Sequence, residues 1–244
     1  MDGTVQLCRG FAVAQWKTLY ARLINRDGTN SDDQEAWRCA IEVFERRIRE
    51  RFLSCIEALE AADSRLDTST PAEAPADCFS LPQQKEAVVP GFAIMALCCL
   101  LAETLQSFRC RTEMPHRPEA RCSYPDRPCI RVPQTTTADA FKAFLRRPAF
   151  GGAFADEQIA ASFIYGVRSG ILHEAETRNW VIWRREPEDQ IVAKEGEGYA
   201  LNRSTFYNAL KKEFAEYLEE LRNSESMELR SRFRKKMNDI AKEA

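Results

Sequence analysis

Apolar residues recur every three or four positions along much of this chain, and no other feature constrains its fold as strongly. In the clearest case one stripe follows residues 31–34 (SDDQ), and it consists of Trp37, Ile41, Phe44, Ile48, Phe52, Ile56 and Leu59. This spacing is typical of an amphipathic α-helix that buries one face, and SDDQ supplies the capping and acidic residues with which helices begin. We therefore expect a mainly α fold.

Similar patterns predict the other helices, together with one small β element. The run from Gly91 to Arg109 is apolar on nearly every side, so we expect a central, fully enclosed helix there. After the helix that follows Asp156, WVIWRREP and QIVAKEGEGYAL carry the β-branched and aromatic residues of a β-hairpin. The remaining helices are expected at residues 7–23, at 137–147 before Pro148, from Asn202 or Ser204 to 221, and around Leu229, Phe233, Met237 and Ile240.

Changes in composition along the chain suggest how these elements are organised. Residues 1–66 would be N-terminal helices that pack on the main bundle, and 67–84 would be a linker rich in small residues and proline. Residues 85–222 would form the helical core, interrupted by an irregular insertion at 110–137 and by the hairpin at 180–201. Residues 223–244 would form a basic C-terminal helix.

Charge and hydropathy limit the function classes. A net charge of −2 argues against a general nucleic-acid coat protein, although basic clusters at 45–51, 109–131 and 229–236 leave local binding sites open. The longest apolar run, residues 88–102, contains Pro90 and Gly91 and stops at Glu103, so we expect no membrane span. The first ten residues do not resemble a signal peptide, and nine scattered cysteines suit reduced thiols. We expect a cytoplasmic protein without membrane partners.

The insertion raises the question of a metal. Cys110, His116, Cys122 and Cys129 are four residues of the types that bind zinc. Their spacing lacks the close pairs, such as C-x2-C, that zinc sites usually have. We therefore expect neither a metal nor another cofactor, while a zinc-containing regulator remains an alternative.

Polar chemistry is densest in YGVRSGILHEAETRNW, residues 165–180, which holds one of the chain's two histidines. On an ideal helix Gly166, Gly170 and His173 share one face, and the small residues make a ridge that a second helix could approach. Arg168 points about 140° away from His173 on the same helix. The two side chains therefore need another helix, or a second copy of the chain, to form one site.

Arginine and histidine together suit phosphate chemistry. An imidazole can take or give a proton near neutral pH, and a guanidinium matches the oxygens of a phosphate. Such a pair could cleave RNA through its own 2′-hydroxyl, with arginine stabilising the charge on phosphorus. The alternative is structural: His173 would cap the helix end and Arg168 would pair with a carboxylate.

The segment RSGILH, Arg168 to His173, matches the R-x4-6-H motif of the HEPN superfamily, and the chain resembles a group of bacterial HEPN-like proteins. The resemblance covers roughly residues 85 to 222. It implies a HEPN-like helical bundle and a metal-independent endoribonuclease, a toxin or anti-phage effector that works as a homodimer.

The resemblance also implies residue roles and partners. Arg168 and His173 would be the catalytic pair, and Glu103 would be an acidic residue contributed by the core helix. Ser169 departs from the Asn, Asp or His that often follows the arginine in the family. Besides RNA, an antitoxin or a defence-system protein could be a partner, and a non-catalytic dimerisation or partner-binding module is the alternative. The RNA contacts that we expect are Ser169, Glu174, Thr177, Arg178 and Arg203.

Overall fold

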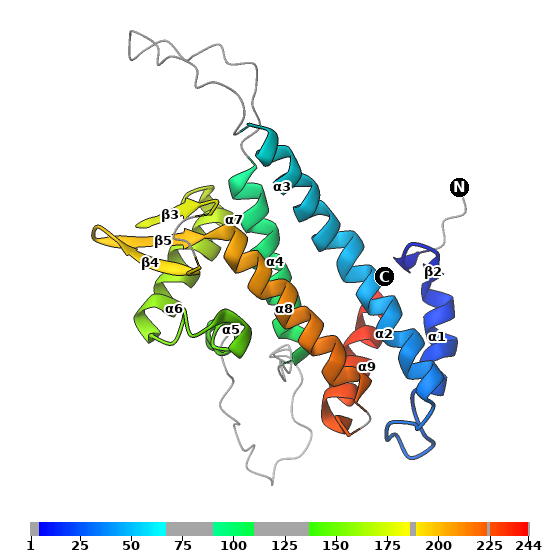
Figure 1. Cartoon of the computed structure of the whole chain (residues 1–244). Coiled ribbons are helices and arrows are strands. Elements are labelled where there is room, and N and C mark those ends of the chain that lie inside the picture. Colours follow the sequence, from blue (N-terminus) through cyan, green and yellow to red (C-terminus); the bar gives the residue numbers. More distant parts are fainter. Residues whose placement is uncertain (1–4, 67–89, 110–136, 186–188, 224, 244) are drawn as a thin grey trace, which may run out of the picture.

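A long rod of helix runs between α1 and the other helices in the computed structural model (Figure 1). The structure describes residues 5–66, 90–109, 137–185, 189–223 and 225–243. The rod comprises α2 (Gln34–Ile48), a π-helical turn η1 (Arg49–Leu53) and α3 (Ser54–Leu66). Asp33 caps it, because its carboxylate accepts a hydrogen bond from the Ala36 amide at 2.9 Å. The predicted long helix is confirmed.

Three further helices pack along or beside this rod. Helix α4 (Gly91–Arg109) contacts α3, and helix α8 (Arg203–Arg222) contacts α2. Helix α9 (Met227–Glu243) contacts α4. Phe44 lies at the centre of the packing, with its ring centroid 4.5 Å from that of Phe108 and 5.4 Å from that of Phe233. One hydrophobic core therefore unites the N-terminal helices with the rest of the bundle.

The N-terminal segment differs from the prediction of a helix over 7–23. Strands β1 (Gln6–Cys8) and β2 (Phe11–Ala12) pair as a short antiparallel ribbon, and α1 (Val13–Arg22) begins only after them. Gly10 has φ of 76°, a left-handed conformation that glycine adopts readily and that turns the chain between the strands. The helical prediction was therefore wrong for residues 7–12 and confirmed beyond them.

A group of short helices that packs beside α4 carries the R-x4-6-H segment. Helix α5 (Thr137–Leu145) ends before Pro148, as predicted, and a 3-10 turn η2 (Pro148–Phe150) follows it. A continuous helical segment then comprises α6 (Glu157–Phe163), a π-helical stretch η3 (Ile164–Ser169) and α7 (Gly170–Glu174). Asp156 caps this segment by accepting a hydrogen bond from the Gln158 amide at 2.6 Å.

The sheet that follows is not the predicted hairpin. Strand β3 (Trp180–Trp183) pairs in parallel with β5 (Gly198–Asn202), which pairs antiparallel with β4 (Val192–Glu195). The hairpin therefore lies within QIVAKEGEGYAL, where Gly196 turns the chain at φ of 54°. Local sequence marked the strands, but the parallel pairing of β3 with β5 is a long-range contact that it could not show.

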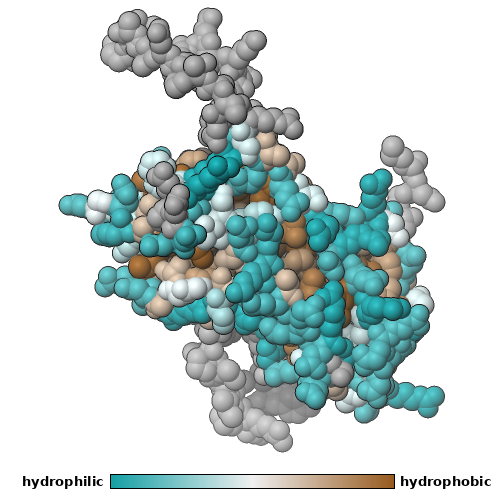
Figure 2. Space-filling view, in the orientation of Figure 1, coloured by the Kyte–Doolittle hydropathy of each residue, from teal (hydrophilic) through white to brown (hydrophobic). Residues whose placement is uncertain are grey.

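Helix α4 is mainly a core helix, although it is not fully enclosed. In the described part of the chain it alone is long and apolar enough to cross a membrane, and 56% of that window is buried inside the protein, as in the core helices of soluble proteins. Phe92 and Leu100 remain 42% and 41% exposed, so the expectation of complete enclosure was wrong for this face. The face drawn in Figure 2 is mostly hydrophilic, with hydrophobic groups visible between α8 and the rod.

Several predictions fall outside the described residues. They are the linker at 67–84, nearly all of the insertion at 110–137, and the cysteine and histidine ligands considered for zinc.

The mainly helical fold is confirmed by the elements above. The basic C-terminal helix is also present as α9, whose Phe233 and Met237 are fully buried.

Candidate functional site

Arg168 and Glu103 form an ion pair that joins η3 to α4. The Arg168 Nε donates to the Glu103 Oε1 at 2.5 Å, and the Arg168 Nη2 contacts the same oxygen. Both side chains are about one quarter exposed, at 25% and 26%. The structure therefore brings together two of the three residues expected to be catalytic, from helices that are 65 residues apart in sequence.

This ion pair lies in the wall of a cavity of about 410 Å³. The cavity is lined by Glu103, Ala138, Phe141, Ile164, Arg168 and Ser169. The Ser169 Oγ accepts a hydrogen bond of 3.5 Å from the Arg168 Nη1, so three polar side chains converge on an otherwise apolar hollow. An oxyanion placed there would meet a guanidinium and a hydroxyl as donors.

Cys99 lies one helical turn before Glu103 on α4, but its thiol cannot serve as a nucleophile for this cavity. Cys99 is fully buried, and burial raises the pKa of its thiol to about 12. A thiol that stays protonated at neutral pH is a poor nucleophile. The reactive groups available near the cavity are therefore the guanidinium, the carboxylate, the hydroxyl and the nearby imidazole.

His173 lies in the last turn of α7, where the helix ends at Ala175 with φ of 55°. Its side chain is exposed and is not part of the cavity wall. Ser169, four residues earlier, is its neighbour one turn back along the helix and also contacts Arg168. Within one chain the structure thus places His173 one helical turn from Ser169, which lines the cavity, and it does not bring His173 and Arg168 into direct contact.

The helix that carries these residues has π-helical geometry from Ile164 to Ser169. A π segment holds an extra residue in its turn and is often found at functional sites. The ideal α-helical projection used to orient Arg168 therefore does not apply to this segment. Nothing in the residue pattern distinguished π from α geometry, because both place apolar residues at nearly the same spacing.

The small-residue ridge is covered by the chain itself. The backbone of residues 176–180 lies against it, with the Arg178 amide 3.3 Å from the Gly166 oxygen and the Glu176 amide 3.3 Å from the Gly170 oxygen. A Cβ atom on Gly166 would lie 2.6 Å from the Arg178 oxygen, and one on Gly170 would lie 2.5 Å from the Glu176 oxygen. The ridge therefore receives this return segment, and the expectation that a second helix approaches it was wrong.

This contact gives a direct test. We expect Gly170→Ala to lower the free energy of unfolding by about 1–3 kcal/mol, because the new methyl group must push the return segment away. Equilibrium urea unfolding at two protein concentrations measures the effect. A loss of stability that does not depend on protein concentration fits a contact within one chain. A loss that appears only because two chains associate more weakly would contradict it.

Two of the residues expected to bind RNA, Glu174 and Arg178, form a small surface cluster with Tyr165. The Arg178 Nε donates to the Glu174 Oε2 at 3.1 Å, and the Arg178 guanidinium lies 4.2 Å from the ring centroid of Tyr165. The Thr177 hydroxyl donates to the Trp180 carbonyl at 2.8 Å, so Thr177 mainly fixes the return segment. Tyr165, at 63% exposure, was not singled out from the sequence, although its place three residues before Arg168 was a usable signal.

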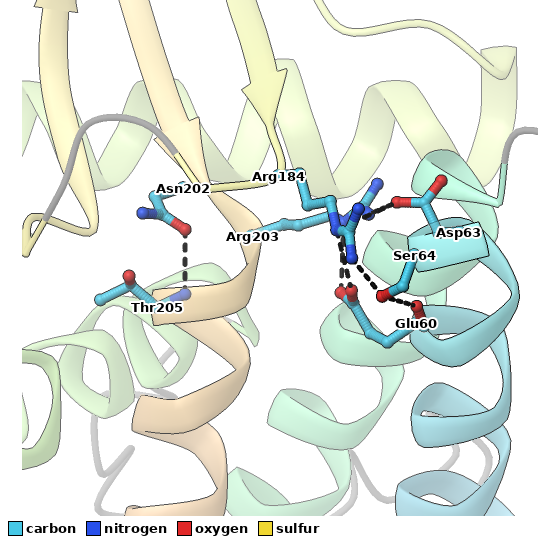
Figure 3. A network of polar contacts seen from close by, with 7 residues as sticks. All are labelled: Glu60, Asp63, Ser64, Arg184, Asn202, Arg203 and Thr205. Carbon is cyan, nitrogen blue, oxygen red and sulfur yellow. Dashed lines mark hydrogen bonds and ion pairs between the residues drawn. The ribbon is translucent and has the colours of Figure 1, made fainter. Parts of the chain in front are cut away.

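Arg203 does not belong to this surface (Figure 3). It is 4% exposed at the start of α8, where its guanidinium pairs with Asp63 and lies 3.2 Å from Glu60 on α3. Arg184, which follows β3, joins the same carboxylates, with its Nε 3.5 Å from the Asp63 Oδ2. The structure thus gives Arg203 a role in fastening α3 to α8, and the RNA contact expected of it was wrong because a buried, paired guanidinium cannot meet a phosphate.

Within the residues that the structure describes, no group of three or more His, Cys, Asp or Glu side chains is placed to hold a metal ion. The candidate site that the sequence and the structure share is the cavity with Arg168, Glu103 and Ser169, together with the exposed His173 one helical turn from Ser169. Compared with known proteins, the chain matches no protein-family model, no curated protein and no solved structure.

Proposed function

We propose that this chain is a metal-independent endoribonuclease of HEPN type that acts in the cytoplasm as a toxin or an anti-phage effector. The observation that carries the proposal is the convergence of Arg168, Glu103 and Ser169 on one cavity, next to an exposed His173. Arginine is suited to the extra negative charge on a five-coordinate phosphorus, and histidine to proton transfer. An antitoxin or another defence-system protein would be its natural partner.

In the proposed reaction the RNA 2′-hydroxyl oxygen attacks the adjacent phosphorus. The O2′–P bond forms, the 2′-hydroxyl proton passes to a base, and the P–O5′ bond breaks as the leaving oxygen takes up a proton. Arg168 would bind the phosphate oxygens, and Glu103 would hold the guanidinium in position until RNA arrives. His173 would carry one of the two protons, and the products would be a 2′,3′-cyclic phosphate and a 5′-hydroxyl.

A homodimer would supply a second histidine for the other proton transfer. Because the glycine ridge is covered, the two copies would have to meet on another face. The exposed apolar residues of α4 are our choice for that face, since Leu100 lies one turn before Glu103 and is 41% exposed. A dimer formed there would place two cavities near a common interface.

The experiment is an RNA cleavage assay in EDTA with a labelled single-stranded RNA. We expect cutting that leaves 2′,3′-cyclic phosphate ends, and we expect His173→Ala to reduce the rate by about 10²- to 10⁴-fold. His116→Ala, at the chain's only other histidine, is the matched control and should retain the activity. Unchanged cleavage by a folded His173→Ala protein, or cleavage that requires added metal, would end this assignment.

The second candidate is a non-catalytic HEPN-like module that dimerises or binds a partner. It is favoured by the ion pair itself, because Glu103 already neutralises Arg168 in the unliganded chain. This reading predicts no cleavage of any RNA by the wild-type protein. It also predicts that Glu103→Gln, which releases the guanidinium, does not produce cleavage.

A further inference from the structure

Tyr165 is an aromatic side chain that lies outside the hydrophobic core. It is 63% exposed, more than any other large hydrophobic residue in the described regions, although it belongs to the helical segment that carries Arg168. Its neighbours Gly166 and Val167 are buried, so the helix turns Tyr165 outward while its other side packs. No core contact of the tyrosine accounts for an aromatic ring at this position.

The ring is nevertheless held in place. The guanidinium of Arg178 lies 4.2 Å from the ring centroid, in a cation–π contact that covers one face. Arg178 is itself fixed at two points, since its side chain pairs with Glu174 and its backbone amide donates to the Gly166 carbonyl. Tyr165 still keeps 63% of its surface exposed, so part of a positioned ring is available to a flat partner.

The position of this ring relates it to the candidate site. Tyr165 lies four residues before Ser169 within η3, and His173 lies four residues after Ser169 in α7. Residues four apart are neighbours on the helix surface in both the π and the α geometry, because each turn holds about four residues. Ser169 also lines the cavity and contacts Arg168. A flat group stacked on Tyr165 would therefore lie beside the place where we propose that a phosphate binds.

We propose that Tyr165 is a stacking platform for one unpaired nucleobase of the RNA substrate, an inference that rests on the proposed ribonuclease function. Every nucleobase has a flat π face that can stack on tyrosine, so the contact favours single-stranded RNA without requiring a particular sequence. A base within a duplex is already stacked on both sides and cannot use the ring. Arg178 adds a positive charge near the neighbouring phosphates, balanced in the free protein by Glu174.

The test measures binding separately from catalysis. Fluorescence anisotropy with a labelled single-stranded oligoadenylate is performed on the His173→Ala protein, which should bind RNA without cutting it. Adding Tyr165→Ala should raise Kd by about 5- to 150-fold, the range that follows from the measured worth of one base–aromatic stack. Tyr165→Phe and Tyr165→Trp should keep the affinity, because each retains an aromatic face. The corresponding RNA duplex should bind more weakly, and Tyr165→Ala should change its Kd little.

The matched control is Trp183→Ala, which removes another exposed aromatic ring, 42% exposed, from strand β3. It should leave Kd unchanged. If RNA binds tightly but Tyr165→Ala has no effect, the platform is excluded while the ribonuclease proposal stands. An equal loss in Tyr165→Phe would overturn stacking in favour of a hydroxyl contact. If neither the wild-type nor the His173→Ala protein binds RNA, both proposals fail.

Discussion

We expect Glu213→Ala to lower the free energy of unfolding by about 3–5 kcal/mol, one of the two largest stability effects predicted for this chain. The Glu213 side chain on α8 is fully buried, and its Oε1 lies 2.5 Å from the Nε of both Arg109 and Arg147. Burial raises the pKa of the Glu213 carboxyl, and the two guanidiniums oppose that shift. Removing the carboxylate would leave a buried guanidinium, Arg109, with much of its charge uncompensated.

Glu220 provides the matched control, since it pairs with the same two arginines from the same helix. Its carboxylate lies 2.8 Å from Arg109 and 3.2 Å from Arg147, but its side chain is 42% exposed. Water can take the place of the Glu220 carboxylate beside the two guanidiniums, so we expect Glu220→Ala to lower the free energy of unfolding by at most about 1 kcal/mol. Urea unfolding of both variants measures the difference. Equal losses would show that burial does not set the strength of this network.

The second large effect is expected for Phe44→Ala, at about 3–5 kcal/mol. Phe44 is fully buried in α2, and its ring packs against Phe108 of α4, Phe233 of α9 and Tyr217 of α8. The substitution leaves a cavity where four helices meet, and these rigid helices cannot close around it. Urea unfolding followed by circular dichroism measures the loss.

The same experiment examines whether residues 1–66 fold with the rest of the chain. Because Phe44 contacts three helices beyond residue 90, we expect one cooperative transition in both the wild-type and the variant protein. Met227→Ala, at the 48% exposed methionine that begins α9, is the control and should change the stability by no more than about 0.5 kcal/mol. Two separate transitions would mean that the N-terminal helices form an independent unit.

Local chemistry explains why most helices could be predicted from the sequence. The caps Asp33, Asp156 and Asn202 each accept a hydrogen bond from an amide two or three residues ahead, so the signal and its effect lie within one short window. Pro148 likewise marks the start of η2. The long apolar stripe of α2 and α3 needed only its own spacing to be recognised. These predictions succeeded because both partners in each interaction are close in sequence.

The candidate site could be predicted only in part. Arg168, His173 and Glu103 were selected from chemistry and from the R-x4-6-H resemblance, and the structure pairs Arg168 with Glu103 across 65 residues. Tyr165 was overlooked, since an exposed tyrosine and a buried one look alike in a sequence. Arg203 was predicted to contact RNA because a buried arginine also looks like an exposed one in a sequence. Its burial against Asp63 depends on where α3 ends in space.

What the sequence determined by itself was the helical class, the positions of most helices and the residue types able to handle a phosphate. Periodicity and capping express interactions between near neighbours, and these are written directly into the order of residues. Only the tertiary structure decided that β3 joins β5 in parallel and that a return segment covers the Gly166–Gly170 ridge. Such contacts depend on how distant segments fit against one another, and small residues such as glycine accept several partners equally well. The fit of residues 176–180 against this ridge turned an expected dimer contact into an internal one.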